Sequence, residues 1–159
     1  GRSSALVELV DILPTVAELA GITLPSGQKF DGMSLVPLIK QPSGTLKTSA
    51  FSQYPRRVRH PDKFWYQNGI IHSDRTLFTH MGYSVRTAEW RYTEWVQWNG
   101  TSLLPVWSNI TARELYDHRN EAAYPTDFDR DENVNLAGEP QFESTVATLS
   151  KMIRAQFGS

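Results

Sequence analysis

The sequence contains no cysteine among its 159 residues. Disulfide bonds, zinc sites built on thiolates and cysteine nucleophiles are therefore excluded within this chain. No apolar run approaches the roughly 18 residues that a membrane-spanning helix needs, so no membrane span is predicted. An excess of charge is missing too, because 16 basic and 17 acidic residues give a formal net charge of −1. Since nucleic-acid-binding proteins usually carry a basic surface, this balance argues against a nucleic-acid partner.

Motifs for a catalytic nucleophile or a phosphate-binding loop are also missing. The sequence contains neither Gly-x-Ser-x-Gly nor a glycine-rich phosphate loop. The acidic segment 127–138 alternates oxygen ligands as a calcium loop does, but Glu132 stands where that loop needs glycine and Gly138 where it needs an acid. We therefore interpret this segment as a solvated turn and expect no catalytic machinery in this chain alone.

The first part of the chain, residues 1–47, is expected to be a strand, a short helix and a connecting segment. Residues 5–10 form an apolar run that predicts a strand, and Asp11 is the expected N-cap of a helix that ends at Gly21. Proline and glycine recur through 22–47. This segment reads as connective, with one short helix around 34–39 and a unit boundary at its end.

The second part, residues 48–159, is expected to be a small antiparallel sheet covered by a helix. Strands are predicted at 49–54, 82–87, 91–98 and 114–117. Apolar residues at helical spacing predict an amphipathic helix from about Pro140 to Phe157. The aromatic side chains between 83 and 98 are expected mainly to fill the core of the sheet. Arg91 and Trp95 share a strand face, so we expect them to stack as a cation–π pair.

Residues 56–80 form a long basic segment in a chain that is close to neutral as a whole. Its basic residues are Arg56, Arg57, Arg59, His60, Lys63, His72, Arg75 and His80, against Asp62 and Asp74. A guanidinium donates paired hydrogen bonds to sulfate or carboxylate, so the segment is a candidate anion-binding site, with a solvated loop as the alternative. The candidate substrate-binding residues are Arg56, Lys63, His72 and Arg75. For Arg56 we favour a structural role, in which it pins the two parts of the chain together.

Two sequons permit N-glycosylation if the protein follows the secretory route. They are Asn99-Gly100-Thr101 and Asn109-Ile110-Thr111. Asn99 and Asn109 are therefore candidate glycosylation sites, and they point weakly to secretion.

Several segments, read together, resemble the type I sulfatase family. VELVDILPTVAELAGI followed by FDGMSLVPLI is similar to the end of the large catalytic domain of that family. SQYPR, MGYSVRT, RYTEW, ARELYDHRNE and ENVNLA, followed by a closing helix, are similar to its C-terminal subdomain. The combination of SQYPR with MGYSVRT and RYTEW is most similar to the iduronate 2-sulfatase group. The similarity is patchy in 22–48, 57–79 and 119–131.

The resemblance implies an α/β fold of the alkaline-phosphatase-like type. Residues 1–47 would then end the catalytic domain and 48–159 would form the C-terminal subdomain. The resemblance implies that the complete protein hydrolyses sulfate esters, with the 2-sulfate of iduronate in heparan or dermatan sulfate as the expected substrate. It implies a lysosomal or secreted location. The alternatives are another sulfatase, a phosphonate hydrolase, or a non-catalytic module that binds anionic glycans.

The family's catalytic groups are expected outside this chain. The resemblance implies a formylglycine, made from the cysteine of a Cys-x-Pro-Ser-Arg type motif, and a calcium ion. Both would belong to the N-terminal catalytic part of the same protein, which is the expected partner of this chain. The nearest echo is residues 53–57, which have Pro55 and Arg57 at the motif's offsets but Gln53 where the nucleophile belongs. No catalytic or metal-binding residue is therefore assigned here.

Overall fold

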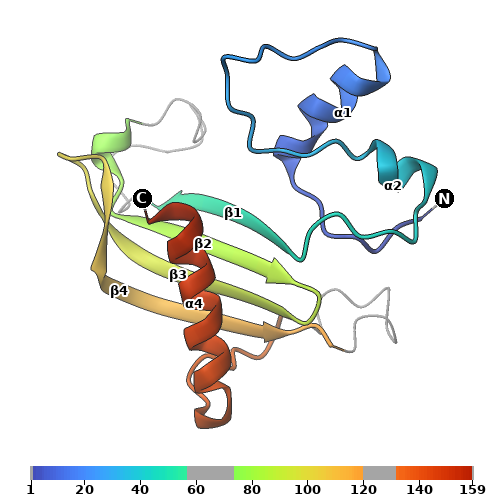
Figure 1. Ribbon diagram of the computed structural model, residues 1–159. Coiled ribbons are helices and arrows are strands. Elements are labelled where there is room, and N and C mark those ends of the chain that lie inside the picture. Colours follow the sequence, from blue (N-terminus) through green and yellow to red (C-terminus); the bar gives the residue numbers. More distant parts are fainter. Residues whose placement is uncertain (1, 57–73, 120–131, 159) are drawn as a thin grey trace. The chain divides into compact units, whose positions relative to one another are not determined.

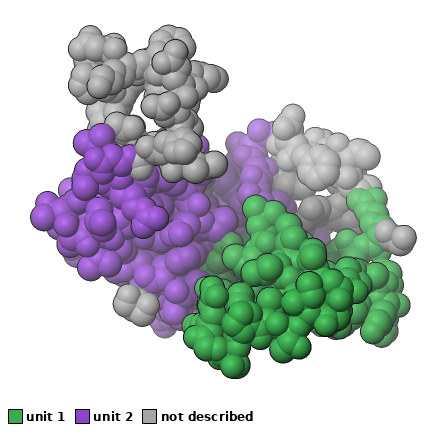
Figure 2. Space-filling view, turned by 90° about the horizontal axis from the view of Figure 1, so that it is seen from above, with its two compact units in different colours: residues 1–51, 86–88 green, residues 52–85, 89–159 purple. Residues whose placement is uncertain are grey.

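The computed structural model describes residues 2–56, 74–119 and 132–158 (Figure 1). The chain divides into two compact units, one made of residues 1–51 with 86–88 and the other of residues 52–85 with 89–159 (Figure 2). Within the described ranges no helix is both long and apolar enough to cross a membrane. The assignment of the first unit to a catalytic domain stays a prediction.

The first unit contains three short helical elements, η1 (Leu9–Asp11), α1 (Ile12–Leu19) and α2 (Val36–Lys40). The strand predicted at 5–10 was wrong. The N–H of Glu8 donates to the Asp11 carboxylate at 2.8 Å, which closes a turn instead of continuing an extended chain. Asp11 is also not a side-chain N-cap of α1, because its carboxylate is committed to this turn and to more distant partners.

The predicted helix ends are close to those observed. Helix α1 ends as expected, since Gly21 has a φ of 67° and the N–H of Ile22 donates to the Ala17 carbonyl at 2.8 Å. Helix α2 begins two residues later than the predicted 34–39. The Ser34 hydroxyl accepts from the N–H of Val36 at 3.2 Å, which fixes where this helix starts.

The sheet has four strands in the order β1-β2-β3-β4. They are β1 (Ser49–Arg56), β2 (His80–Thr87), β3 (Trp90–Asn99) and β4 (Leu104–Asp117). Strands β3 and β4 pair antiparallel. Three of the predicted strands are close to the observed ones, whereas the prediction for β4 found only its last four residues.

Strand β4 is long but irregular. Val96 pairs with Ile110 while its neighbour Gln97 pairs with Val106, so the pairing register skips residues 107–109, which form a bulge. Within the bulge, the side chains of Trp107 and Asn109 have different surroundings. Trp107 lies 4.9 Å from Tyr83 between ring centroids, while Asn109 is exposed and donates to Gln97.

The core of the second unit lies between one face of the sheet and the C-terminal helix. The turn η6 (Pro140–Phe142) leads into α4 (Glu143–Phe157), which crosses the sheet in Figure 1. The sheet contributes the buried side chains of Met81, Tyr83, Val85, Tyr92, Val96 and Leu115. Helix α4 contributes the buried Leu149 and Ile153. The aromatic residues on this face therefore do fill the core, as predicted.

Candidate functional site

The basic segment begins and ends at the same end of the sheet. Arg56 is the last residue of β1, and its carbonyl accepts from the N–H of Thr79 at 2.9 Å. Thr79 in turn accepts from the N–H of Trp98, near the end of β3, at 2.9 Å. Of the predicted substrate-binding residues, Arg56 and Arg75 are described, whereas Lys63 and His72 lie outside the described residues.

The side chain of Arg56 stacks on an aromatic ring. Its guanidinium carbon lies 4.2 Å from the centroid of the Trp95 ring, which is a cation–π distance. The predicted pairing of Trp95 with Arg91 was therefore wrong. Arg91 instead places its Nε 2.9 Å from a carboxylate oxygen of Glu132. A shared strand face could not identify the cation over Trp95, because that cation, Arg56, belongs to β1.

The Trp95 ring is held from two sides. Its Nε1 donates to Glu114 at 2.7 Å, and the other carboxylate oxygen of Glu114 accepts from the Tyr116 hydroxyl at 3.3 Å. A Cβ at Gly82 would lie 2.7 to 2.9 Å from three carbons of the ring, so only glycine lets the ring lie flat there. Burial and the neighbouring Glu114 carboxylate raise the pKa of Tyr116, which keeps its hydroxyl protonated.

Arg75 lies at the same end of the sheet but is held differently. It is exposed and begins the short turn η4 (Arg75–Leu77), which the Asp74 carboxylate caps by accepting from the N–H of Thr76 at 2.9 Å. The Arg75 carbonyl accepts from Nε1 of Trp98 at 3.0 Å. The backbone of Arg75 is thus fixed, whereas no described ring lies under its guanidinium.

The remaining described arginines of the second unit have acidic neighbours. Arg91 contacts Glu132, Arg119 contacts Asp117, and Arg113 and Arg154 each lie 4.0 Å from Glu94. Among the described residues, no carboxylate lies within ion-pair distance of Arg56 or Arg75. These two are therefore the described arginines of this unit best able to accept an external anion.

A buried carboxylate on β3 was missed by sequence reasoning. Glu94 is 0% exposed and accepts from the Tyr92 hydroxyl at 2.8 Å, with Arg113 and Arg154 each 4.0 Å away. Burial and the Glu94 carboxylate raise the pKa of Tyr92 far above its ordinary value. Arg154 belongs to α4 and also stacks over Trp107. The sequence contained a signal for this buried carboxylate, since Glu94 alternates with the apolar Tyr92 and Val96 along β3. Through Arg154, Glu94 links α4 to the sheet.

The first unit contains a second buried polar cluster. The Asp11 carboxylate accepts from the N–H of Met33 at 2.8 Å and from Nζ of Lys47 at 2.9 Å. Glu8 accepts from the same Nζ at 2.5 Å and from the N–H of Phe51 at 2.7 Å. The cluster therefore joins four separated parts of this unit.

This cluster does not fit a calcium ion. The Lys47 ammonium already occupies the space between the two carboxylates, and calcium needs six to eight oxygen ligands. Within the described ranges, no group of three or more acidic or histidine side chains is arranged to hold a metal. The segment 127–131 lies outside those ranges.

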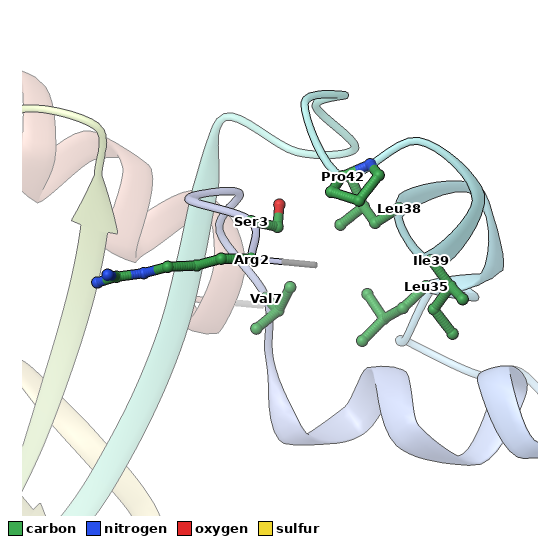
Figure 3. A pocket seen from close by; sticks show the side chains of 7 residues that line it. All are labelled: Arg2, Ser3, Val7, Leu35, Leu38, Ile39 and Pro42. Atoms are coloured by element: carbon green, nitrogen blue, oxygen red, sulfur yellow. The ribbon is translucent and has the colours of Figure 1, made fainter.

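A hollow of about 340 Å³ lies in the first unit (Figure 3). Its lining is Arg2, Ser3, Val7, Leu35, Leu38, Ile39 and Pro42. The Arg2 side chain points away from the apolar cluster of Leu35, Leu38 and Ile39 in Figure 3. The hollow therefore offers apolar walls without a charged group directed into it, and it does not resemble a site for an anionic substrate.

Both candidate glycosylation sites are exposed. The side-chain oxygen of Asn99 accepts from the N–H of Thr101 at 2.9 Å, which forms a local turn. The Asn109 amide nitrogen donates to Gln97 at 2.5 Å. Neither position is sterically closed, and their glycosylation stays a prediction.

Comparison with known proteins identifies the family, although no family model matches the chain. Iduronate 2-sulfatase of Mus musculus is 34% identical over 129 residues, which cover 70% of this chain and 22% of that protein. Arylsulfatase K of Gallus gallus is 30% identical over 152 residues, covering 96% of this chain and 22% of that protein. The chain belongs to the sulfatase family.

A bacterial relative extends this comparison. Delta 4,5-hexuronate-2-O-sulfatase of Bacteroides thetaiotaomicron is 27% identical over 138 residues, which cover 87% of this chain and 21% of that protein. The chain thus spans about a fifth of the length of these sulfatases. Sulfatases imply the alkaline-phosphatase-like fold, and the antiparallel sheet with its C-terminal helix is consistent with a C-terminal subdomain of that fold.

Proposed function

We propose that this chain is the C-terminal part of a sulfatase that removes the 2-O-sulfate of a uronic acid. Two of the similar proteins are named for 2-sulfated uronates, iduronate in one and an unsaturated hexuronate in the other. The proposed substrate is the 2-sulfate of iduronate in heparan or dermatan sulfate. The proposed location is lysosomal or secreted, with glycans at Asn99 and Asn109.

The observation that carries the proposal for this chain's own role is an apolar stripe on the first unit. Leu9, Ile12, Leu13, Val16 and Leu19, spaced as one helical face, are exposed by 53% to 86%. The opposite side of the same segment is polar yet buried, since Asp11 and Thr15 face inward and are hydrogen-bonded. A helix that buries its polar side and exposes its apolar side needs a further apolar partner.

The partner we propose is the N-terminal catalytic part of the same protein. It would cover the stripe and complete the catalytic domain, while the sheet and α4 complete the substrate entrance. The formylglycine and the calcium ion would both be supplied by that part. This assignment agrees with the first unit, where the clustered carboxylates of Glu8 and Asp11 are already bound to Lys47.

Turnover by the complete protein tests the proposal. Sulfate release is measured from a disaccharide with 2-O-sulfated iduronate and from one with 6-O-sulfated glucosamine, and release of the alcohol is measured from a phosphonate monoester. We expect release from the first substrate alone, and none from the isolated 159-residue chain. Turnover by the isolated chain, or a preference for the phosphonate, would overturn the proposal.

A further inference from the structure

We propose that Arg56 is a preorganised binding residue for a planar pair of oxyanion oxygens and that Trp95 is its positioning residue. The ligand chemistry is a carboxylate or a sulfate group, both of which a uronate 2-sulfate carries. This assignment rests on the proposed function only for the source of the oxyanion, because binding itself requires no turnover.

The stack leaves the hydrogen-bond donors of Arg56 available. Its guanidinium carbon lies over the Trp95 ring, 4.2 Å from the centroid. The N–H groups of a guanidinium lie in its plane and form a fork that matches two oxygens of one anion. Arg56 is exposed, and no described residue forms an ion pair with it. The guanidinium is therefore held over a ring, while its N–H groups form no ion pair with any described residue.

The ring under Arg56 is fixed, and so is the backbone of Arg56. Glu114 holds the indole N–H at 2.7 Å, and Gly82 admits the ring close to the strand. The Arg56 carbonyl accepts from both the N–H and the hydroxyl of Thr79, at 2.9 and 3.3 Å. A side chain fixed at both ends loses little conformational freedom on binding, and this raises affinity for a given set of contacts.

Arg56 lies in a part of the sequence that is rich in basic residues. Arg56 begins the basic segment of residues 56–80, which also contains Arg57, Arg59 and Arg75. Clustered positive charge raises the local concentration of anions and the rate at which they associate. Arg119 provides a matched control, because its guanidinium carbon also lies over a tryptophan ring, 4.6 Å from the Trp90 centroid, while its N–H groups already donate to Asp117.

The first experiment measures binding of two simple probes to the 159-residue chain. Sodium glucuronate carries only the carboxylate and sodium sulfate only the inorganic anion. Each is titrated while the Nε–Hε resonance of Arg56 is followed by NMR, at fixed ionic strength. We expect at least one probe to shift this resonance saturably, and Arg56→Lys to weaken binding about tenfold, since lysine offers a point charge without a fork.

The control separates charge from geometry. Arg119→Lys should leave the affinity for the same probe within about twofold, because the N–H groups of Arg119 are already bound to Asp117 and are not available to the probe. The probe that binds identifies the source as carboxylate or sulfate. Equal weakening by both substitutions, or no saturable shift with either probe, would overturn the assignment of Arg56.

The positioning role of Trp95 has its own readout. Trp95→Phe keeps an aromatic face, so we expect it to retain most of the affinity and the ring-current shift of the Arg56 resonance. Trp95→Leu should lose both, to the level of Arg56→Lys, with the fold monitored by the NMR signals of buried Leu115 and Ile153. Wild-type affinity in Trp95→Leu would show that Trp95 does not position Arg56. A complete protein without sulfatase activity would contradict the proposed function but leave these titrations unaffected.

Discussion

Asp11, Glu8 and Lys47 form a buried charged cluster in which each partner depends on the others. The side chains of Lys47 and Glu8 are 11% and 18% exposed, and that of Asp11 is fully buried. Removing one member of such a cluster leaves uncompensated charge in a poorly solvated place. This costs far more than removing a surface ion pair.

Lys47→Met should therefore destabilise the chain strongly. The substitution keeps the aliphatic stem but leaves two carboxylates facing each other, and the expected loss is about 3–5 kcal/mol of the free energy of unfolding. Urea unfolding followed by circular dichroism measures it. The control is Lys29→Met, since the Lys29 side chain is 91% exposed in its pair with Asp31. Similar losses in both variants would contradict the buried role of Lys47.

The pH dependence of stability should also report this cluster. Burial alone would raise the pKa of Asp11, but hydrogen bonds from Lys47, Met33 and Glu8 outweigh burial and hold it below the ordinary 3.8. Because the folded pKa is the lower one, the stabilisation is present above 3.8 and is lost as the pH falls through the folded pKa. We expect Asp11→Asn to be less stable than the wild type at pH 6, with the difference shrinking below pH 4. Melting temperatures across this range check it, and a constant difference would contradict it.

Single residues also show what the sequence could and could not reveal about the site. The chemistry of Arg56 was readable, because guanidinium groups suit oxyanions wherever they are exposed. Its aromatic partner, Trp95, could not be predicted from the sequence. The alternation along β3 placed Arg91 beside Trp95, but the stack depends on how β1 lies against the rest of the sheet, which no local pattern encodes.

Elements with a strong period were predicted well and irregular ones were not. Helix α4 has apolar residues at helical spacing along its whole length, so its limits were nearly correct. Strand β4 loses its alternation at the bulge of residues 107–109 and contains Pro105, so its first ten residues read as loop. The strand predicted at 5–10 was wrong for another reason. The Asp11 carboxylate accepts a hydrogen bond from the backbone N–H of Glu8, which a strand would have used for pairing.

The packing of α4 on the sheet predicts a large effect of one core substitution. Ile153 is fully buried on α4, so Ile153→Ala should cost about 2–5 kcal/mol through lost burial and a residual cavity. Lys151→Ala, on the exposed side of the same helix, should cost less than about 0.5 kcal/mol. Thermal unfolding of both variants measures the difference. A small effect of Ile153→Ala would mean that α4 does not pack on the sheet as described.

At the scale of the whole molecule, the structure forms one compact unit from residues 1–51 with 86–88 and another from residues 52–85 with 89–159. The sequence predicted domains at 1–47 and 48–159, with a strand and a short helix in the first, and that domain assignment stays a prediction. The sequence did not predict which side of α1 is covered. Apolar periodicity identifies a stripe but says nothing about what lies against it. In the structure this stripe is exposed while Asp11 and Thr15 are buried, and this reversal is the main physical reason to expect a larger partner.

The stripe should tolerate charge in the isolated chain. Leu13 and Val16 are both more than half exposed, so Leu13→Lys with Val16→Lys should change the free energy of unfolding by less than about 1 kcal/mol, the sum for two surface substitutions. The double variant should also be more soluble, because it breaks up an apolar patch. Urea unfolding and light scattering measure these effects. A loss of several kcal/mol would show that these side chains are already packed within the chain.

Reconstitution of sulfatase activity from two pieces shows whether this chain completes a catalytic domain. The N-terminal catalytic part and this chain are produced separately and mixed, and sulfate release from 2-O-sulfated iduronate is measured against each piece alone. We expect activity only in the mixture, and a loss of at least tenfold when the chain carries the Leu13→Lys and Val16→Lys substitutions, which corresponds to about 1.4 kcal/mol of docking energy. Activity of the chain alone, or equal activity with the substituted chain, would contradict the account.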